Sequence, residues 1–363
     1  MDIKEYKCPN CGGTVNFDSS VQKLKCPSCD TEFEIEALEE YQKDSSAPQG
    51  DTFNWNTGTA GTAWDGSELD DLSSGSCPSC GAELIGDKNT IAMVCPCCGN
   101  AQIVQKRISG LLKPNYCMPF QLDKKAAVKA LKAFCKKKRL LPNFFLTENH
   151  INSIQGMYAP FWLFDAKASA HITYRASRIG RVWGDSNYIY TQTDHYSVVR
   201  SGSLDFEKVP VDGSEKLDDA YMDAIEPFDY NQIKDYTSAY LAGYSAEKYD
   251  VSAEKSKERA SARIKQSIEM EFARSVTGFT TVSVQSSSVE VGNGKVSYAM
   301  IPLWILNTKY RKKSYQFIMN GQTGRLVGRL PVDRGKAWKY RFMFLFGIGA
   351  ALTVIISLLR VFI

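Results

Sequence analysis

Residues 8–29 read CPNCGGTVNFDSSVQKLKCPSC, and residues 77–98 repeat the same spacing as CPSCGAELIGDKNTIAMVCPCC. Each copy has two Cys-Pro-x-Cys knuckles that are fourteen residues apart. A tetrahedral Zn²⁺ takes four thiolates at about 2.3 Å, and a short β-hairpin between the knuckles brings the second pair back to the first. The pattern predicts two structural Zn²⁺ ions with these ligands: Cys8, Cys11, Cys26 and Cys29 in a first zinc ribbon, and Cys77, Cys80, Cys95 and Cys98 in a second.

Two other chemistries are open to the same eight thiols. Disulfides are disfavoured in a reducing compartment, and rubredoxin-like iron takes the same four sulfur ligands. Cys97 lies between Cys95 and Cys98 and could exchange as a ligand, although the spacing favours the outer pair. Asp30 follows one knuckle where glycine follows the other three, and aspartate tolerates the left-handed backbone conformation better than most residues.

The charges on the two ribbons favour protein over nucleic acid as a partner. Up to Glu40 there are nine acidic residues and four lysines, and the second ribbon has Glu83, Asp87 and Lys88 up to Val104. Neither ribbon carries the basic patch that phosphate contacts need. We therefore expect the ribbons to dock on proteins.

The C-terminal residues 342–363 read FMFLFGIGAALTVIISLLRVFI, with Arg360 as their only charge. As a helix this stretch would be about 33 Å long, close to the roughly 30 Å of a bilayer core. Ten basic residues and one acidic residue lie between Lys309 and Arg341, which by the positive-inside rule keeps the preceding body in the cytoplasm. The sequence predicts a single-pass protein of the cell membrane with one C-terminal transmembrane helix. A buried core helix is the alternative.

These features divide the 363 residues into consecutive parts. The hydrophobic content of 44% and the charged content of 23% are ordinary for globular protein, and the net charge is only +4. Residues 41–76 are rich in Ser, Gly and Thr and predict a flexible linker, in which Trp55 and Trp64 are either a short docking motif or aromatic residues lying on a nearby ribbon. The predicted parts are ribbon 1 (1–40), the linker (41–76), ribbon 2 (77–107), the body (108–335), and a basic flank with the transmembrane helix (336–363).

The body contains an internal echo. YAPFWLFD at residues 158–165 resembles MIPLWILN at residues 300–307. The strands that would start here, with helices predicted over residues 216–225, 230–241 and 252–275, indicate an α+β body of β-hairpins and helices. The echo is a candidate internal repeat, with coincidence as the alternative. The matching positions are Pro160 with Pro302, Trp162 with Trp304, and Asp165 with Asn307.

A lysine-rich helix is predicted near the start of the body. Asp123 is a good N-cap for a helix that runs to about Arg139, with Ala127 and Leu131 facing the core. Its lysine face is ordinarily a solvated surface. Contact with anionic lipid headgroups or with an acidic partner are the alternatives.

The sequence predicts no enzyme. It has no G-x-x-x-x-G-K-[ST] loop, no G-x-S-x-G elbow and no H-E-x-x-H motif. The histidines His150, His171 and His195 read as surface or core residues, and Cys117 and Cys135 as buried thiols. We expect no catalytic residues and no cofactor beyond the two metal ions.

Several motifs together resemble a known family. CPNCGG (8–13), NYCMPF (115–120), GMYAPFWLFDA (156–166), YLAGY (240–244) and NGQTGRLVGRLP (320–331) are similar to bacterial membrane-anchored proteins with TFIIB-type zinc ribbons. Members are often labelled as similar to the primosomal replication helicase, but this chain lacks the nucleotide-binding loop that a helicase needs. The resemblance implies a membrane scaffold with a role in envelope maintenance.

Two functions follow as expectations. The first is a tail-anchored scaffold whose ribbons recruit cytosolic proteins to the membrane. The alternative is a membrane-tethered protein that binds nucleic acid through the lysine-rich helix.

Overall fold

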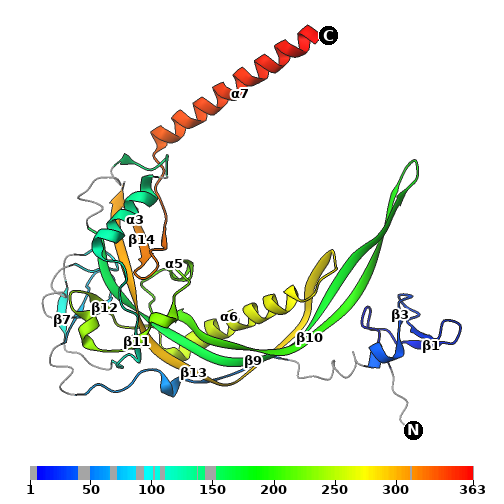
Figure 1. Ribbon diagram of the computed structural model, residues 1–363, viewed down its shortest axis with the longest axis horizontal. Helices are drawn as coiled ribbons and strands as arrows, with labels where there is room; N and C mark the ends of the chain where they lie inside the picture. Colours follow the sequence, from blue (N-terminus) through cyan, green and yellow to red (C-terminus); the bar gives the residue numbers. More distant parts are fainter. Residues whose placement is uncertain are drawn as a thin grey trace. The chain divides into compact units, whose positions relative to one another are not determined.

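The computed structural model describes residues 6–39, 50–65, 72–86, 94–100, 103–106, 111–136, 138–143, 153–310 and 313–362. It contains helices and large sheets, so the α+β class is confirmed (Figure 1). The strands are β1 Asn16–Asp18, β2 Lys23–Lys25, β3 Glu32–Phe33, β4 Thr52–Asn56, β5 Ser73–Ser76, β6 Glu83–Gly86, β7 Val104–Lys106, β8 Tyr116–Cys117, β9 Gln155–Gly184, β10 Ile189–Asp212, β11 Lys234–Asp235, β12 Ser245–Glu247, β13 Thr281–Tyr310, β14 Lys313–Asn320 and β15 Leu326–Gly328. The helices are α3 Lys124–Lys136, α5 Asp219–Ala224, α6 Ala253–Arg274 and α7 Arg334–Phe362, with 3-10 turns η1 Thr57–Thr59, η3 Tyr230–Gln232 and η4 Ser238–Leu241.

The strands form two sheets. A three-stranded antiparallel sheet in the order β1-β2-β3 lies in the first ribbon. A twelve-stranded sheet contains β9 and β13 as neighbours, each 30 residues long. β10 pairs with β9, and β14 pairs antiparallel with β13. The β-branched and aromatic residues of these long strands suit a pleated, half-buried surface.

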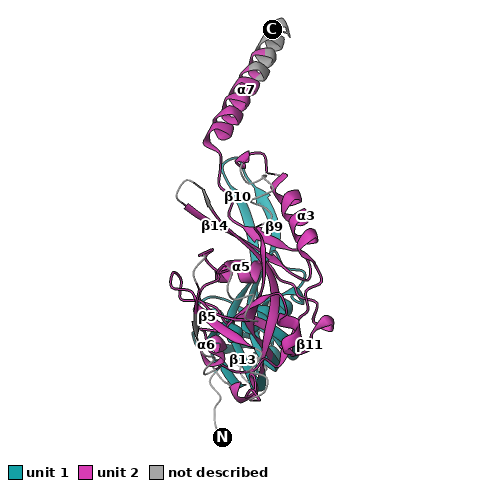
Figure 2. Cartoon of the chain, turned by 90° about the vertical axis from the view of Figure 1, so that its left-hand side faces the viewer, with its two compact units in different colours: residues 1–56, 165–209, 258–295 teal, residues 57–164, 210–257, 296–363 magenta. Residues whose placement is uncertain are grey.

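The chain divides into two compact units, which Figure 2 colours separately. Unit 1 comprises residues 1–56, 165–209 and 258–295, and unit 2 comprises residues 57–164, 210–257 and 296–363. In unit 1, Ile264 and Ile268 of α6 pack with Tyr174 and other buried residues of the sheet. In unit 2, the main core contains Phe161 and other apolar residues of β9 together with those of β13. Each unit is thus assembled from separate stretches of sequence.

The two echoing segments make the same backbone contact. The carbonyl of Pro160 accepts a hydrogen bond from the N–H of Gly213, at 2.8 Å. The carbonyl of Pro302 accepts one from the N–H of Gly321, also at 2.8 Å. In both cases the residue that donates this hydrogen bond is a glycine. A Cβ at either position would press on neighbouring side chains.

The two tryptophans of the echo are also equivalent. The indole N–H of Trp162 donates to the carbonyl of Val251 at 2.9 Å, and that of Trp304 donates to the carbonyl of Leu122 at 3.0 Å. Both rings are almost completely buried, so each N–H finds the backbone acceptor that burial requires. These matching contacts support the predicted internal repeat.

The predicted helices have mixed outcomes. The prediction for residues 252–275 is confirmed by α6, and Asp123 caps α3 by accepting from the N–H of Ala126 at 2.7 Å. The helix predicted over residues 230–241 is wrong. There β11 separates two 3-10 turns, because Lys234 pairs with Cys117 of β8 and takes the backbone away from helical hydrogen bonds.

The predicted flexible linker is wrong over residues 52–56. These residues form β4, which pairs in parallel with β13, with Trp55 opposite Gly294. The indole N–H of Trp55 donates to Ser261 of α6 at 3.0 Å. Trp55 is therefore a packed residue of unit 1, and neither of the two sequence readings of this tryptophan placed it there.

The predicted transmembrane helix and membrane localisation are contradicted. α7 is 29 residues long, but among the described residues no helix is long and apolar enough to cross a membrane.

Candidate metal centres

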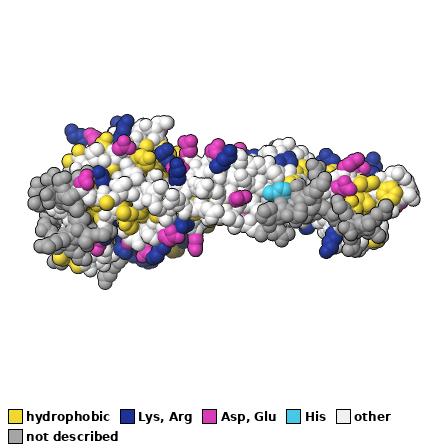
Figure 3. Space-filling view, turned by 90° about the horizontal axis from the view of Figure 1, so that it is seen from below, with side chains coloured by type: hydrophobic (Ala, Val, Ile, Leu, Met, Phe, Trp, Pro, Cys, Tyr) yellow, Lys and Arg dark blue, Asp and Glu magenta, His cyan; other side chains and the backbone are white. Residues whose placement is uncertain are grey.

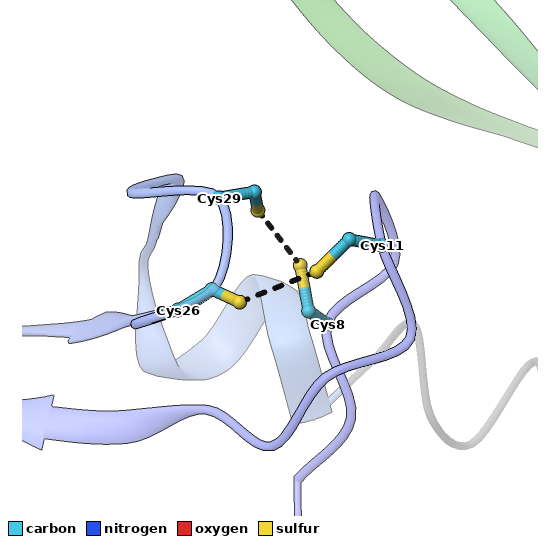
Figure 4. A group of neighbouring side chains, drawn as sticks. All are labelled: Cys8, Cys11, Cys26 and Cys29. Carbon is cyan, nitrogen blue, oxygen red and sulfur yellow. Dashed lines mark hydrogen bonds between the residues drawn. The ribbon is translucent and has the colours of Figure 1, made fainter.

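The first cluster is built by two tight knuckles of the first ribbon (Figure 4). The N–H of Gly12 donates to the carbonyl of Cys8, and the N–H of Asp30 donates to that of Cys26, both at 2.8 Å. Gly12 has φ of 76° and Asp30 has φ of 56°, so both residues adopt the left-handed conformation. The tolerance of Asp30 for this conformation, which the sequence predicted, is confirmed.

The four sulfur atoms of the first cluster have the spacing of metal ligands. The Sγ atoms of Cys8 and Cys29 are 3.6 Å apart and those of Cys11 and Cys26 are 3.4 Å apart. All four lie within 4.8 Å of one another. Tetrahedral metal–sulfur bonds of about 2.3 Å imply sulfur–sulfur distances of about 3.8 Å, whereas a disulfide requires about 2.05 Å. The donor set fits a four-thiolate metal ion, and these cysteines are free thiols.

The second cluster repeats the first. The N–H of Gly81 donates to the carbonyl of Cys77 at 2.9 Å, and the N–H of Gly99 donates to that of Cys95 at 2.8 Å. The Sγ atoms of Cys77 and Cys98 are 3.6 Å apart, and those of Cys80 and Cys95 are 3.8 Å apart. All eight predicted cysteines are therefore brought together in two groups that could each hold a metal ion.

The two clusters have different surroundings. Cys77 and Cys95 are 1% and 0% exposed and belong to the main hydrophobic core of unit 2. The first cluster has a small core of its own, made with Val15, Leu24 and Leu38 of the ribbon. The second cluster is thus part of the main core of unit 2, and the first belongs to a ribbon of unit 1 that has a small core of its own.

Two amide side chains hold the knuckle of the second cluster. Asn307 of β13 donates to the carbonyl of Pro96, and Gln316 of β14 donates to the carbonyl of Cys97 at 3.0 Å. Gln316 also donates to Asn307, at 3.1 Å. The sequence matched Asn307 with Asp165 but attached no role to it, and Gln316 was not singled out.

Cys97 lies beside the second cluster rather than in it. The group whose sulfur atoms converge consists of the outer cysteines, as the spacing predicted. A hydrogen bond with Cys95, together with burial, raises the pKa of Cys97, and the same hydrogen bond lowers the pKa of Cys95 to about 5. Cys97 therefore stays a thiol that donates to the Cys95 sulfur.

A buried carboxyl group lies behind Cys97. Glu247 is 1% exposed, and its Oε1 accepts a hydrogen bond from Ser214 at 2.9 Å. Burial raises the pKa of Glu247 to about 8.

In the first cluster, hydrogen bonds from the side chain and backbone of Thr31 lower the pKa of Cys29 to about 6. One thiol in each group, Cys29 in the first and Cys95 in the second, is thus readily available as the thiolate that a metal ion binds.

The other candidate residues are scattered. His171 forms a 2.6 Å hydrogen bond with Ser201, and His195 lies on β10, where it borders a hollow of about 790 Å³. Cys117 and Cys135 are buried thiols, and burial raises the pKa of each. His150 lies outside the described residues. Among the described residues, no hydrogen bond or ion pair places a carboxylate beside His171.

Surface charge is mixed. On the face shown in Figure 3, basic and acidic side chains of the described residues are interspersed. The exposed side chains of α3 are an exception, since its buried residues Ala127, Leu131 and Cys135 leave the lysines on the outer face.

One relative extends over almost the whole chain. The uncharacterized protein YdjG of Bacillus subtilis (strain 168) is 37% identical over 338 residues, which cover 93% of each chain. No family model matches the sequence, and no solved structure matches it. The predicted resemblance to membrane-anchored zinc-ribbon proteins stays a prediction.

Proposed function

This chain belongs to the same family as YdjG of Bacillus subtilis, and we propose that it is a zinc-dependent adaptor that recruits a protein partner through its first ribbon. The observation that carries the proposal is the contrast between the two cysteine clusters. One is buried in the core of unit 2, and the other holds together a separate small ribbon. A cluster of four thiolates leaves no open coordination position, so both ions are structural.

Zinc is the metal that we propose for both sites. Four converging thiolates suit Zn²⁺ or iron, and the sulfur–sulfur distances of 3.4 to 3.8 Å rule out disulfides in this structure. Rubredoxin-like iron remains the alternative. Absorption spectroscopy distinguishes the two, because ferric thiolate sites are coloured and Zn²⁺ has a filled d shell.

The surface of the first ribbon suits a basic protein partner. Its described part has six acidic residues, Asp18, Asp30, Glu32, Glu34, Glu36 and Glu39, against Lys7, Lys23 and Lys25. Four thiolates on a divalent ion add two further negative charges. Phe17, Val21 and Ile35 are exposed on this ribbon and supply apolar contact area. Nucleic acid would be repelled by such a surface.

The second ribbon has a different role in this proposal. Its knuckle is tied to β13 and β14 through Asn307 and Gln316. Its metal ion would therefore stabilise unit 2 and would contribute to partner binding only through the fold.

The test is a pull-down with the full chain, with crosslinking and mass spectrometry to identify the partner. The variant Ile35→Asp with Glu36→Lys changes the ribbon surface and leaves the thiols in place. Val332→Asp is the matched control, because Val332 is an exposed apolar residue of unit 2. We expect a specific protein to be retained by the unmodified chain and the control and lost from the ribbon variant. Equal recovery with all three chains would exclude the ribbon as the recruiting surface.

A nucleic-acid-binding role through α3 is the second candidate. The exposed lysines of this helix are the observation in its favour. Binding through phosphate contacts would weaken steeply with salt and would be reduced by Lys125→Glu with Lys129→Glu. Affinity that is absent, or that does not change with salt, would dismiss this role.

A further inference from the structure

The tip of the β9–β10 hairpin, residues 178–195, extends beyond the neighbouring strand. β13 begins at Thr281, and the contacts around its start reach β9 at Ser177 and Ile179. In the described chain, β10 pairs with β9 alone. Figure 1 shows the hairpin continuing past the start of β13. A two-stranded hairpin is only marginally stable in water without a further strand or a packed face.

The hairpin tip exposes many large apolar side chains. Ile189 is 82% exposed and Trp183 is 52% exposed. Soluble proteins rarely expose such groups together unless the surface binds something. The exposed set on this tip is Ile179, Val182, Trp183, Tyr188, Ile189 and Tyr190.

These side chains are held in place before any partner binds. The rings of Trp183 and Tyr190 are stacked, with centroids 5.7 Å apart and an interplanar angle of 15°. Asp185 accepts hydrogen bonds from the N–H groups of Asn187 and Tyr188, both at 2.9 Å, and from the hydroxyl of Tyr190 at 3.1 Å. A preorganised surface loses little conformational entropy when it docks.

The charges of the hairpin tip are balanced. The tip contains two basic residues, Arg178 and Arg181, and two acidic residues, Asp185 and Asp194. It therefore has no net charge with His195 neutral. Phosphate-rich surfaces attract strongly basic segments. The hairpin tip is not a strongly basic segment, so it does not suit a phosphate-rich partner. Tryptophan, tyrosine and arginine are the residues that dominate binding energy in protein interfaces. The composition therefore fits another protein surface with charges of both signs.

We propose that the hairpin tip docks on the same tip of a second copy of this chain. A twofold axis allows the two arginines of one copy to lie opposite the two aspartates of the other, so a tip with equal numbers of both charges can be complementary to itself. The outer edge of β10 also presents backbone donors and acceptors that the equivalent edge of a second copy pairs with in antiparallel fashion. Docking would cover the apolar side chains and add the strands that the hairpin tip lacks.

Sedimentation velocity of the full chain over a range of concentrations tests this proposal. We expect a reversible dimer whose dissociation constant rises at least about tenfold in Ile189→Asp. Ile189 is so exposed that this change should leave the fold and the circular dichroism spectrum unchanged. Val332→Asp, which alters an exposed valine of unit 2, is the matched control and should dimerise like the unmodified chain. A full chain that stays monomeric, or Ile189→Asp dimers as tight as the unmodified ones, would overturn the proposal.

A charge exchange tests the symmetry of the pairing. Arg181→Glu and Asp194→Arg should each weaken self-association, because each puts like charges together across the twofold axis. A mixture of the two variants should form a heterodimer more tightly than either variant alone forms a homodimer. Failure of the mixture to associate would exclude docking on a second copy, and a chain that then captures a different protein would show that the tip serves another partner.

Discussion

The indole ring of Trp55 lies directly over Gly294, where a Cβ would overlap ring atoms of the tryptophan. The two residues are opposite each other in the β4–β13 ladder, 239 positions apart in sequence. Between Val291 and Gly294 the ladder is irregular, and Asn293 adopts φ of 53°, which indicates a β-bulge. The glycine and the bulge together make room for the ring.

Gly294→Ala should destabilise unit 1 by about 1–3 kcal/mol, because the new methyl group has no space beneath Trp55. Gly292→Ala is the matched control on the same strand, since a Cβ there meets nothing within 4 Å. It should change the free energy of unfolding by no more than about 0.5 kcal/mol. Urea denaturation of both variants measures the difference. Equal destabilisation would mean that Trp55 does not occupy this position.

The metal content should be two ions per chain. Cys77→Ala should reduce it to one, because the second cluster would lose a ligand, whereas Cys97→Ala should retain both ions. Elemental analysis of the purified proteins measures the stoichiometry. A Cys97→Ala protein that holds one ion would show that Cys97 is a ligand after all.

The first cluster should release its metal ion to a chelator before the second. Cys11 is exposed on a ribbon with a small core, whereas Cys77 and Cys95 are buried in the core of unit 2. A colorimetric chelator should therefore show two phases, and the faster phase should be missing in Cys8→Ala. Loss of the slower phase in that variant instead would reverse the assignment.

Metal binding should weaken as the pH falls. Metal ions bind thiolates, so protons compete with them for the same sulfur atoms. The lowered pKa values of Cys29, about 6, and Cys95, about 5, keep these two sulfurs deprotonated at neutral pH. Their thiolate form is lost as the pH falls through those values. Equilibrium dialysis with Zn²⁺ between pH 7 and pH 5 measures the trend, and an affinity that does not change with pH would contradict thiolate ligation.

Asn307→Ala should loosen the second metal site alone. It removes the hydrogen bond to the Pro96 carbonyl that holds the Cys95–Cys98 knuckle. Loss of such a supporting contact typically lowers metal affinity by about tenfold or more. Competition with a chelator of known affinity should show weaker binding in the slow phase only. Asn231→Ala provides a control, because Asn231 is exposed and contacts Asp229 in its own turn.

The metal centres were largely predictable because their geometry is local. A knuckle spans four residues, and its left-handed residues, Gly12 and Asp30, follow directly in the chain. The ligand spacing therefore identified both groups and the exclusion of Cys97. Asn307 and Gln316 could not be assigned, because they reach the second knuckle only after β13 and β14 have paired.

Local composition was a poor guide to the structure of two segments. Ser and Gly around Trp55 suggested a flexible linker, yet β4 is ordered by pairing with β13. The apolar residues 342–363 suggested a membrane span, which the structure contradicts over the residues that it describes. The linker prediction considered the local residues without their neighbours in space.

By itself, the sequence determined the two four-cysteine groups, the α+β class, and the two proline–tryptophan segments of β9 and β13. Each depends on spacing within a few residues or on the pattern of one strand. Only the tertiary structure decided that the second four-cysteine cluster is buried in the core of unit 2, while the first holds a ribbon with a small core of its own. It also decided that Trp55 packs over Gly294. These outcomes depend on pairing between segments hundreds of residues apart, where the free energy comes from burial and backbone hydrogen bonds that no single segment can make alone.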